Sequence, residues 1–150
     1  MSDAERIADI IELARNAGEF RAIQREAANK LRRGAGEKWP HNGCGAMLSC
    51  LLQRGGIAVS DTLRAFDFRG LLAKRGWTVI PVGDQQAGDV GSTCGPKPHH
   101  GTDHVYLVLE VKTRDDMVIA DNQKPAPHLR SASGKGKSKT RFFMRAPQAA

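Results

Sequence analysis

The stretch WPHNGCGAMLSCLLQRGG, residues 39–56, places a cysteine between two glycines where a loop gives way to a helix. Pro40 and Asn42 are typical of a loop that leads into a helix N-terminus. From Cys44 onward, apolar residues recur at helical spacing until the glycine pair 55–56, which predicts a short buried helix. The functional question is whether the Cys44 thiol is a nucleophile, a metal ligand or a small core residue.

Further helices are predicted on both sides of this stretch. Ser2 and the glutamate three residues later form the pattern of a capping box, which predicts a first helix that ends at Gly18. Apolar residues at helical spacing predict a second helix over 20–31. A fourth helix is expected to begin at 60 or 61 and to end by 76.

Strands are predicted in the second half of the chain. Runs rich in β-branched and aromatic residues predict strands at 77–82, 104–111, 117–121 and 141–146, with loops at 83–103 and 122–140. Helices that precede strands indicate an α+β fold, with N-terminal helices packed on a small antiparallel sheet. A chain of 150 residues with 40% hydrophobic content is expected to form a single domain, 1–150.

The charge of the chain limits its partners. A formal net charge of +7 favours nucleic acid, anionic lipid or the acidic polymers of a bacterial envelope. The first twenty residues are charged throughout, unlike a signal peptide, and no window reaches the roughly 18 apolar residues of a membrane span. We therefore expect synthesis in the cytoplasm and no membrane partner. Three cysteines, an odd number, predict an unpaired thiol rather than a disulfide framework.

Cys44 has the position of a nucleophile, because the positive end of a helix dipole stabilises a thiolate. Its flanking glycines leave room for a substrate carbonyl, and nearby backbone N–H groups could stabilise an oxyanion. The competing interpretation is a core residue, since unpaired cysteines are usually buried. Cys50 lies about 120° away around the helix, so we expect it in the core and not beside Cys44.

A histidine, His104, begins the otherwise apolar strand HVYLVLEV and can serve as the base for the thiol. A third residue must then hold the imidazole, and the next strand ends with Asp121 and Asn122. A four-residue turn, 113–116, would place Asp121 on the face of His104, whereas a five-residue turn, 112–116, would select Asn122. The sequence leaves the register open; Asp121 is preferred because a carboxylate stabilises an imidazolium more strongly than an amide does.

Taken together, these features resemble the papain-like cysteine peptidases of the NlpC/P60 and CHAP superfamily. NGCGAMLSCLLQRGGI is similar to the DCSG motif and its helix, QAGDV to a PGD turn, and HVYLVL to an HVGI strand. The resemblance covers residues 42–123 and departs at Gly43, Gly45 and Tyr106, where the family has an acidic residue, a serine and a glycine. The strand DMVIADN is also similar to the VLDN ending of bacterial transglutaminase-like cysteine proteinases.

The resemblance implies a papain-like fold, with 39–146 as the catalytic core and 1–38 as a helical extension. It also implies a peptidoglycan amidase or endopeptidase that acts through a thioester, without a metal or cofactor. The catalytic residues would be Cys44, His104 and either Asp121 or Asn122. The residues expected to contact substrate are Asn42, Gly45, His99 and His100.

The resemblance also bears on where the protein acts. A chain of this kind without a signal peptide suits a phage lysis or tail protein, or an injected effector. Such a protein would reach the bacterial wall or periplasm after lysis or injection, and an inhibitor or immunity protein would be a further partner. A protein-directed protease, deamidase or transglutaminase is the alternative, because cysteine–histidine chemistry serves any acyl transfer.

Two other functions fit the sequence less well. The segment CGPKPHHGTDH holds Cys94, His99, His100 and His104, but their spacing matches no familiar zinc pattern, and adjacent histidines on an extended chain point to opposite sides. The basic run SGKGKSKTR lacks the first glycine of a phosphate-binding loop and the interleaved aromatic residues that stack on bases. A zinc- or nucleic-acid-binding basic domain is therefore the second alternative, and we expect neither a metal nor a nucleic-acid partner.

Overall fold

The helices occupy the first half of the chain in the computed structural model, which describes residues 1–148. They are α1 (Asp3–Arg15), α2 (Ala17–Ala35), α3 (Cys44–Arg54), the 3-10 turn η1 (Ala65–Asp67) and α4 (Phe68–Lys74). The predicted capping box is present, because the N–H of Glu5 donates to Ser2 Oγ at 3.2 Å and the Glu5 carboxylate accepts from the Ser2 N–H. Among residues 1–148, no helix is both long and apolar enough to cross a bilayer.

Two of the predicted helix boundaries are wrong. The first helix ends before Gly18, because Asn16 closes α1 and also caps α2, accepting a hydrogen bond from Glu19 N at 3.0 Å. The fourth helix begins later than 60 or 61. Asp61 does not cap it; its carboxylate accepts from Lys30 at 2.7 Å and from Gln53 at 2.8 Å, which ties an irregular segment to α2 and α3.

The second half of the chain forms an antiparallel sheet of six strands. They are β1 (Thr78–Ile80), β2 (Val90–Ser92), β3 (Val105–Val111), β4 (Asp116–Ala120), β5 (His128–Ser131) and β6 (Phe142–Arg145), in the order β1-β6-β2-β3-β4-β5. The predicted α+β class is confirmed. The segments predicted as loops, 83–103 and 122–140, contain the short strands β2 and β5. Gly91 of β2 lies opposite Tyr106, and a side chain there would overlap the tyrosine ring.

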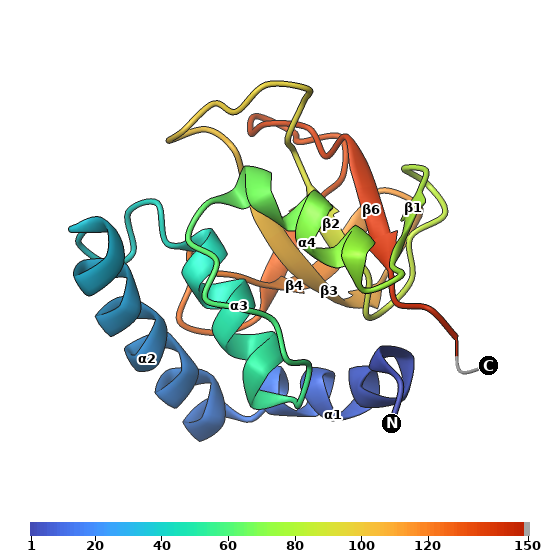
Figure 1. Cartoon of the computed structure of the whole chain (residues 1–150). Coiled ribbons are helices and arrows are strands. Elements are labelled where there is room, and N and C mark those ends of the chain that lie inside the picture. The colour runs from blue at the N-terminus through green and yellow to red at the C-terminus, as the bar shows by residue number, and fades with distance from the viewer. Residues whose placement is uncertain (149–150) are drawn as a thin grey trace.

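The sheet has helices on one face, as Figure 1 shows, and α3 packs against both α2 and β3. Along β3, Val105 and Leu107 belong to the main core with the helices, whereas Tyr106 and Val108 belong to a smaller cluster with residues of β4 and β6. Buried residues of α1 and α2 lie in the same main core as those of α3. Residues 1–38 therefore pack as one body with the sheet.

The hairpin between β3 and β4 contains a β-bulge that changes its register. Val111 pairs with Met117, which corresponds to the five-residue turn. The register then shifts between Val108 and Glu110, so that Leu109 is an extra residue in β3 and Leu107 pairs with Ala120. A shift of one residue moves every later side chain of the partner strand to the opposite face.

Candidate active site

Cys44 is the first residue of α3, and its side chain lies at the N-terminal end of the helix dipole. Gly43 occupies the cap position and supplies no side-chain hydrogen bond, so the N–H groups of the first turn have no side-chain cap. The Cys44 Sγ lies 3.9 Å from the backbone oxygen of Asp103. Cys44 is only 6% exposed and belongs to the main core, but it also lines two surface cavities.

His104 is held by a buried carboxylate and lines the same cavity as Cys44. Its Nε2 lies 2.8 Å from Asp121 Oδ2, and the two residues are 7% and 2% exposed. Its backbone is fixed by Thr93, since His104 N donates to Thr93 Oγ1 at 2.9 Å and Thr93 N donates to His104 O at 3.0 Å. With Nε2 engaged by Asp121, Nδ1 is the ring nitrogen left for Cys44.

The charges in this pair shift both pKa values. Burial alone lowers the pKa of His104, but hydrogen bonding with Asp121 and with the Cys44 side chain raises it to about 9. Burial alone raises the pKa of Asp121, but hydrogen bonds from His104 and His128 hold it well below its usual range. At neutral pH the pair is therefore an imidazolium beside a carboxylate.

The β-bulge determines which residue at the end of β4 lies on the same face of the sheet as His104. Without it, the five-residue turn would bring Asn122 to the histidine's face; the extra residue in β3 brings Asp121 instead. Asn122 donates from Nδ2 to Pro40 O at 2.8 Å, and its buried Oδ1 has no hydrogen-bond partner among residues 1–148. The alternative in which Asn122 orients the imidazole is thus wrong for this structure; Asn122 braces the loop before Cys44.

A second histidine, His128, holds the other oxygen of Asp121, and the sequence analysis missed it. Its Nε2 lies 2.8 Å from Asp121 Oδ1, which also accepts from Gln123 N at 2.9 Å. Gln24 of α2 donates to the backbone oxygen of Asp121 at 3.3 Å. The carboxylate therefore has little freedom to rotate away from His104. No local motif marks His128, because only the pairing of β5 with β4 brings it near.

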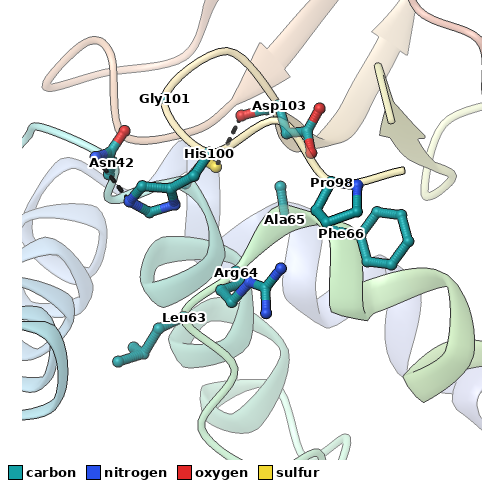
Figure 2. A pocket seen from close by; sticks show the side chains of 10 residues that line it. Asn42, Leu63, Arg64, Ala65, Phe66, Pro98, His100, Gly101 and Asp103 are labelled. Carbon is teal, nitrogen blue, oxygen red and sulfur yellow. Dashed lines mark hydrogen bonds between the residues drawn. The ribbon is translucent and has the colours of Figure 1, made fainter. Parts of the chain in front are cut away.

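Two cavities meet at Cys44. One has a volume of about 430 Å³ and reaches from the 40–42 loop to His104 and Asn122. The other is a narrow cavity between the 63–66 segment and the 98–103 loop, shown in Figure 2. Both include Asn42, Cys44, Gly101 and Asp103 in their walls. The larger cavity therefore has room for a substrate beside the thiol, whereas the narrow one, about 20 Å³, holds little more than a water molecule.

The four residues predicted to contact substrate have different positions. Asn42 and His100 lie side by side in the wall of the narrow cavity (Figure 2), with Asn42 Nδ2 3.2 Å from His100 Nε2. His99 points to a different, basic cavity. Gly45 is buried and lines neither cavity at the thiol; a Cβ there would stand 2.7 Å from the backbone carbon of Leu63. Gly45 therefore serves the close packing of α3 against the 62–63 backbone.

The possible zinc ligands of the CGPKPHHGTDH segment do not converge. His104 faces Asp121, while His100 lies near Asn42 and, at 3.5 Å, near the Glu37 carboxylate. Within the described range, 1–148, no three His, Cys, Asp or Glu side chains gather in a way that could hold a metal ion.

Comparisons with known proteins give little information about this chain. No protein-family model matches it, and neither does any curated protein. Among solved structures, the crystal structure of Ly7917 is 23% identical, with a TM-score of 0.48, over 83% of this chain and 62% of that one. This chain thus spans less than two thirds of that protein. The likeness is too distant to carry an argument about fold family or function.

Proposed function

We propose that this protein is a papain-like cysteine hydrolase that cuts an amide bond in peptidoglycan. The observation that carries the proposal is the position of His104, which is held by Asp121 at 2.8 Å through one ring nitrogen and lines the same cavity as the Cys44 thiol. A nucleophile, a base and an orienting carboxylate in this order are the parts that acyl transfer requires.

The reaction begins from a thiolate–imidazolium pair, in which the thiol proton already resides on His104, and the Cys44 sulfur attacks the amide carbonyl. The uncapped N–H groups at the start of α3 are available to stabilise the oxyanion. The imidazolium then donates its proton to the leaving amine, the C–N bond breaks, and a thioester remains. His104, now neutral, takes a proton from the water molecule that attacks the thioester. The C–S bond breaks, a carboxylic acid is released, and the sulfur leaves as a thiolate, which restores the starting thiolate–imidazolium pair. Asp121 keeps the imidazole oriented in both steps.

The papain-like assignment is supported by the order of the elements. The cysteine begins a buried helix, the histidine precedes β3, and the carboxylate follows β4 in the same antiparallel sheet. This is the arrangement that the resemblance to NlpC/P60 and CHAP enzymes implies. The net charge of +7 supports an anionic wall polymer as the substrate.

The test is to incubate purified peptidoglycan fragments with the wild type, Cys44→Ala and Cys50→Ala, and to identify new products by mass. Cys50→Ala is the matched control, because Cys50 is a buried thiol of the same helix. Product release by the wild type and Cys50→Ala, but not by Cys44→Ala, supports the proposal. If Cys44 reacts with an alkylating reagent but no wall fragment is cut, the peptidoglycan proposal fails, and protein substrates, as in the deamidase or transglutaminase alternative, are the next to test.

A further inference from the structure

A basic cavity adjoins the proposed active site and has no role in the mechanism above. Its volume is about 430 Å³, and it lies between the 93–103 loop and the segment that leads into β6. These two segments lie side by side in Figure 1. Its cationic side chains are Lys97, Lys139 and Arg141, with His99 beside them.

These cations are not neutralised within the protein. Among the described residues, no carboxylate lies within ion-pair distance of Lys97, Lys139 or Arg141, although other lysines and arginines of the chain do form ion pairs. Asp103 is the one acidic residue in the wall, and its Oδ2 accepts a hydrogen bond from His99 N at 2.8 Å. Three unpaired cations against one engaged carboxylate give the cavity an excess of positive charge.

The cavity is built on rigid backbone at its inner end. Arg141 N donates to Ser92 O at 2.8 Å, which anchors the start of β6 to β2. A Cβ on Gly95 would stand 3.6 Å from Arg141 Cζ, so the guanidinium lies against the glycine backbone. A guanidinium presents several donors in one plane, which suits a carboxylate or a phosphate.

The cavity is close enough to the thiol for one substrate to occupy both. Asp103 lines the basic cavity and both cavities at Cys44, and its backbone oxygen lies 3.9 Å from Cys44 Sγ. Thr93, also in the basic wall, holds the backbone of His104 through hydrogen bonds at 2.9 and 3.0 Å. Only Asp103 and Thr93 would thus separate an anion bound in this cavity from the proposed nucleophile and base.

We propose that the basic cavity is a substrate subsite that binds an anionic group, a carboxylate or a phosphate, on the molecule cut at Cys44. This inference rests on the proposed function, since it names a feature of the same substrate. It gives the enzyme a preference for amides that carry a negative charge beyond the cleaved bond. The preference weakens with salt, because the cations are exposed to solvent.

The activity test compares peptidoglycan fragments that have native carboxylates with the same fragments after conversion of those carboxylates to methylamides. We expect the wild type to cut the native fragments with a kcat/KM about tenfold higher. The double variant Lys139→Gln/Arg141→Gln should lose this ratio and keep its kcat/KM for the methylamides. The control Arg21→Gln/Lys74→Gln removes the same charge from residues that line none of these cavities and should keep the ratio. An unchanged ratio in the Lys139/Arg141 variant overturns the subsite.

A binding test separates this inference from the proposed function. Acetate and inorganic phosphate are titrated into the Cys44→Ala protein, and the backbone amide signals of Gly95 and Thr102 are followed by NMR. The subsite is supported, even if no wall fragment is cut, by saturable shifts with either anion that disappear in Lys139→Gln/Arg141→Gln. Stronger binding of phosphate than of acetate would identify a phosphate as the anionic group. Cleavage of wall fragments without such shifts leaves the hydrolase standing and overturns the subsite.

Discussion

Replacement of Asp121 with asparagine removes the charge beside His104 but keeps the size of the side chain. In the wild type, Oδ1 accepts from His128 Nε2 at 2.8 Å and from Gln123 N at 2.9 Å, while Oδ2 faces His104 Nε2. Two donors meet Oδ1, so the asparagine oxygen should stay there and its NH₂ group should face His104. Nε2 must then accept a hydrogen bond, which places the proton of neutral His104 on Nδ1.

This tautomer points a proton toward Cys44 and cannot take one from it. We expect kcat to fall by about 10² to 10⁴-fold, the range seen when a general base is lost or held in the wrong tautomer. Substrate binding should change much less, since Asp121 lines none of the cavities at the thiol. The loss should therefore appear in kcat and not in KM.

Stability gives a second, independent readout of the same substitution. The pKa of His104 rises from 6.5 to about 9 on folding, which at about 1.4 kcal/mol per pKa unit corresponds to about 3 kcal/mol, shared between Asp121 and Cys44. Because the folded pKa is raised, this contribution is complete below pH 6.5 and is lost as pH rises through 9. The lowered pKa of Asp121 contributes above pH 3.8 and is lost on acidification. The free energy of unfolding of Asp121→Asn should thus fall furthest below that of the wild type between about pH 4 and 6.5.

The assay is urea unfolding of both proteins at pH 5, 7, 9 and 10, together with steady-state kinetics on wall fragments. Asn122→Ala is the matched control, because it removes a neighbouring hydrogen bond, to Pro40 O at 2.8 Å, that involves no charge. Its cost should be about 1 kcal/mol at every pH. Our reasoning is refuted if Asp121→Asn loses less than tenfold in kcat and keeps the wild-type dependence of stability on pH.

Three further predictions concern the thiols, the helix start and the second histidine. Iodoacetamide at pH 7 should modify Cys44 and spare Cys94, since burial raises the pKa of Cys94 to about 11 and leaves roughly one thiolate in 10⁴; equal modification, measured by peptide mass, would contradict this. Gly45→Ala should lower the free energy of unfolding by about 1–3 kcal/mol, because its Cβ would press on the Leu63 backbone at 2.7 Å; an unchanged urea midpoint would count against it. His128→Ala should lower kcat about tenfold at constant KM, and His128→Gln, whose amide can still donate to the carboxylate, should recover part of the loss.

The identity of the third site residue shows how far the sequence can be read. The hydrophobic runs predict both strands of the hairpin and leave two possible registers, which differ by one residue. The observed turn, with Val111 opposite Met117, is the one expected to favour Asn122, yet Asp121 faces the imidazole. The reason is the bulge at Leu109, which nothing in the alternation of VYLVLEV reveals. The preference for a carboxylate thus led to Asp121, whereas the observed turn length alone would have pointed to Asn122.

The strands that sequence analysis missed are short and depend on distant partners. β2 contains a central glycine and has only three residues, so it has neither the length nor the β-branched content of a recognisable strand. β5 lies in a polar segment and is ordered by pairing with β4. Because β5 carries His128, the missed strand and the missed site residue have the same cause. Periodicity reports which side chains face a core, whereas this pairing is set by contacts across the sheet.

The N-terminal helices bear on the site more directly than the predicted division at residue 38 suggests. Gln24 of α2 donates to the backbone oxygens of Asp121 and Lys124, at 3.3 and 2.9 Å, which fixes the chain just after β4. Lys30, also on α2, donates to Asp61 at 2.7 Å and so restrains the segment before η1. Residues 63–66, which follow Asp61 closely, form one wall of the narrow cavity. One helix therefore braces the carboxylate on one side of the cleft and a wall on the other. A side chain that must stay within hydrogen-bonding distance of an imidazole needs such support, since a small displacement of Asp121 would uncouple it from His104. On this argument, α2 belongs to the machinery of the proposed active site.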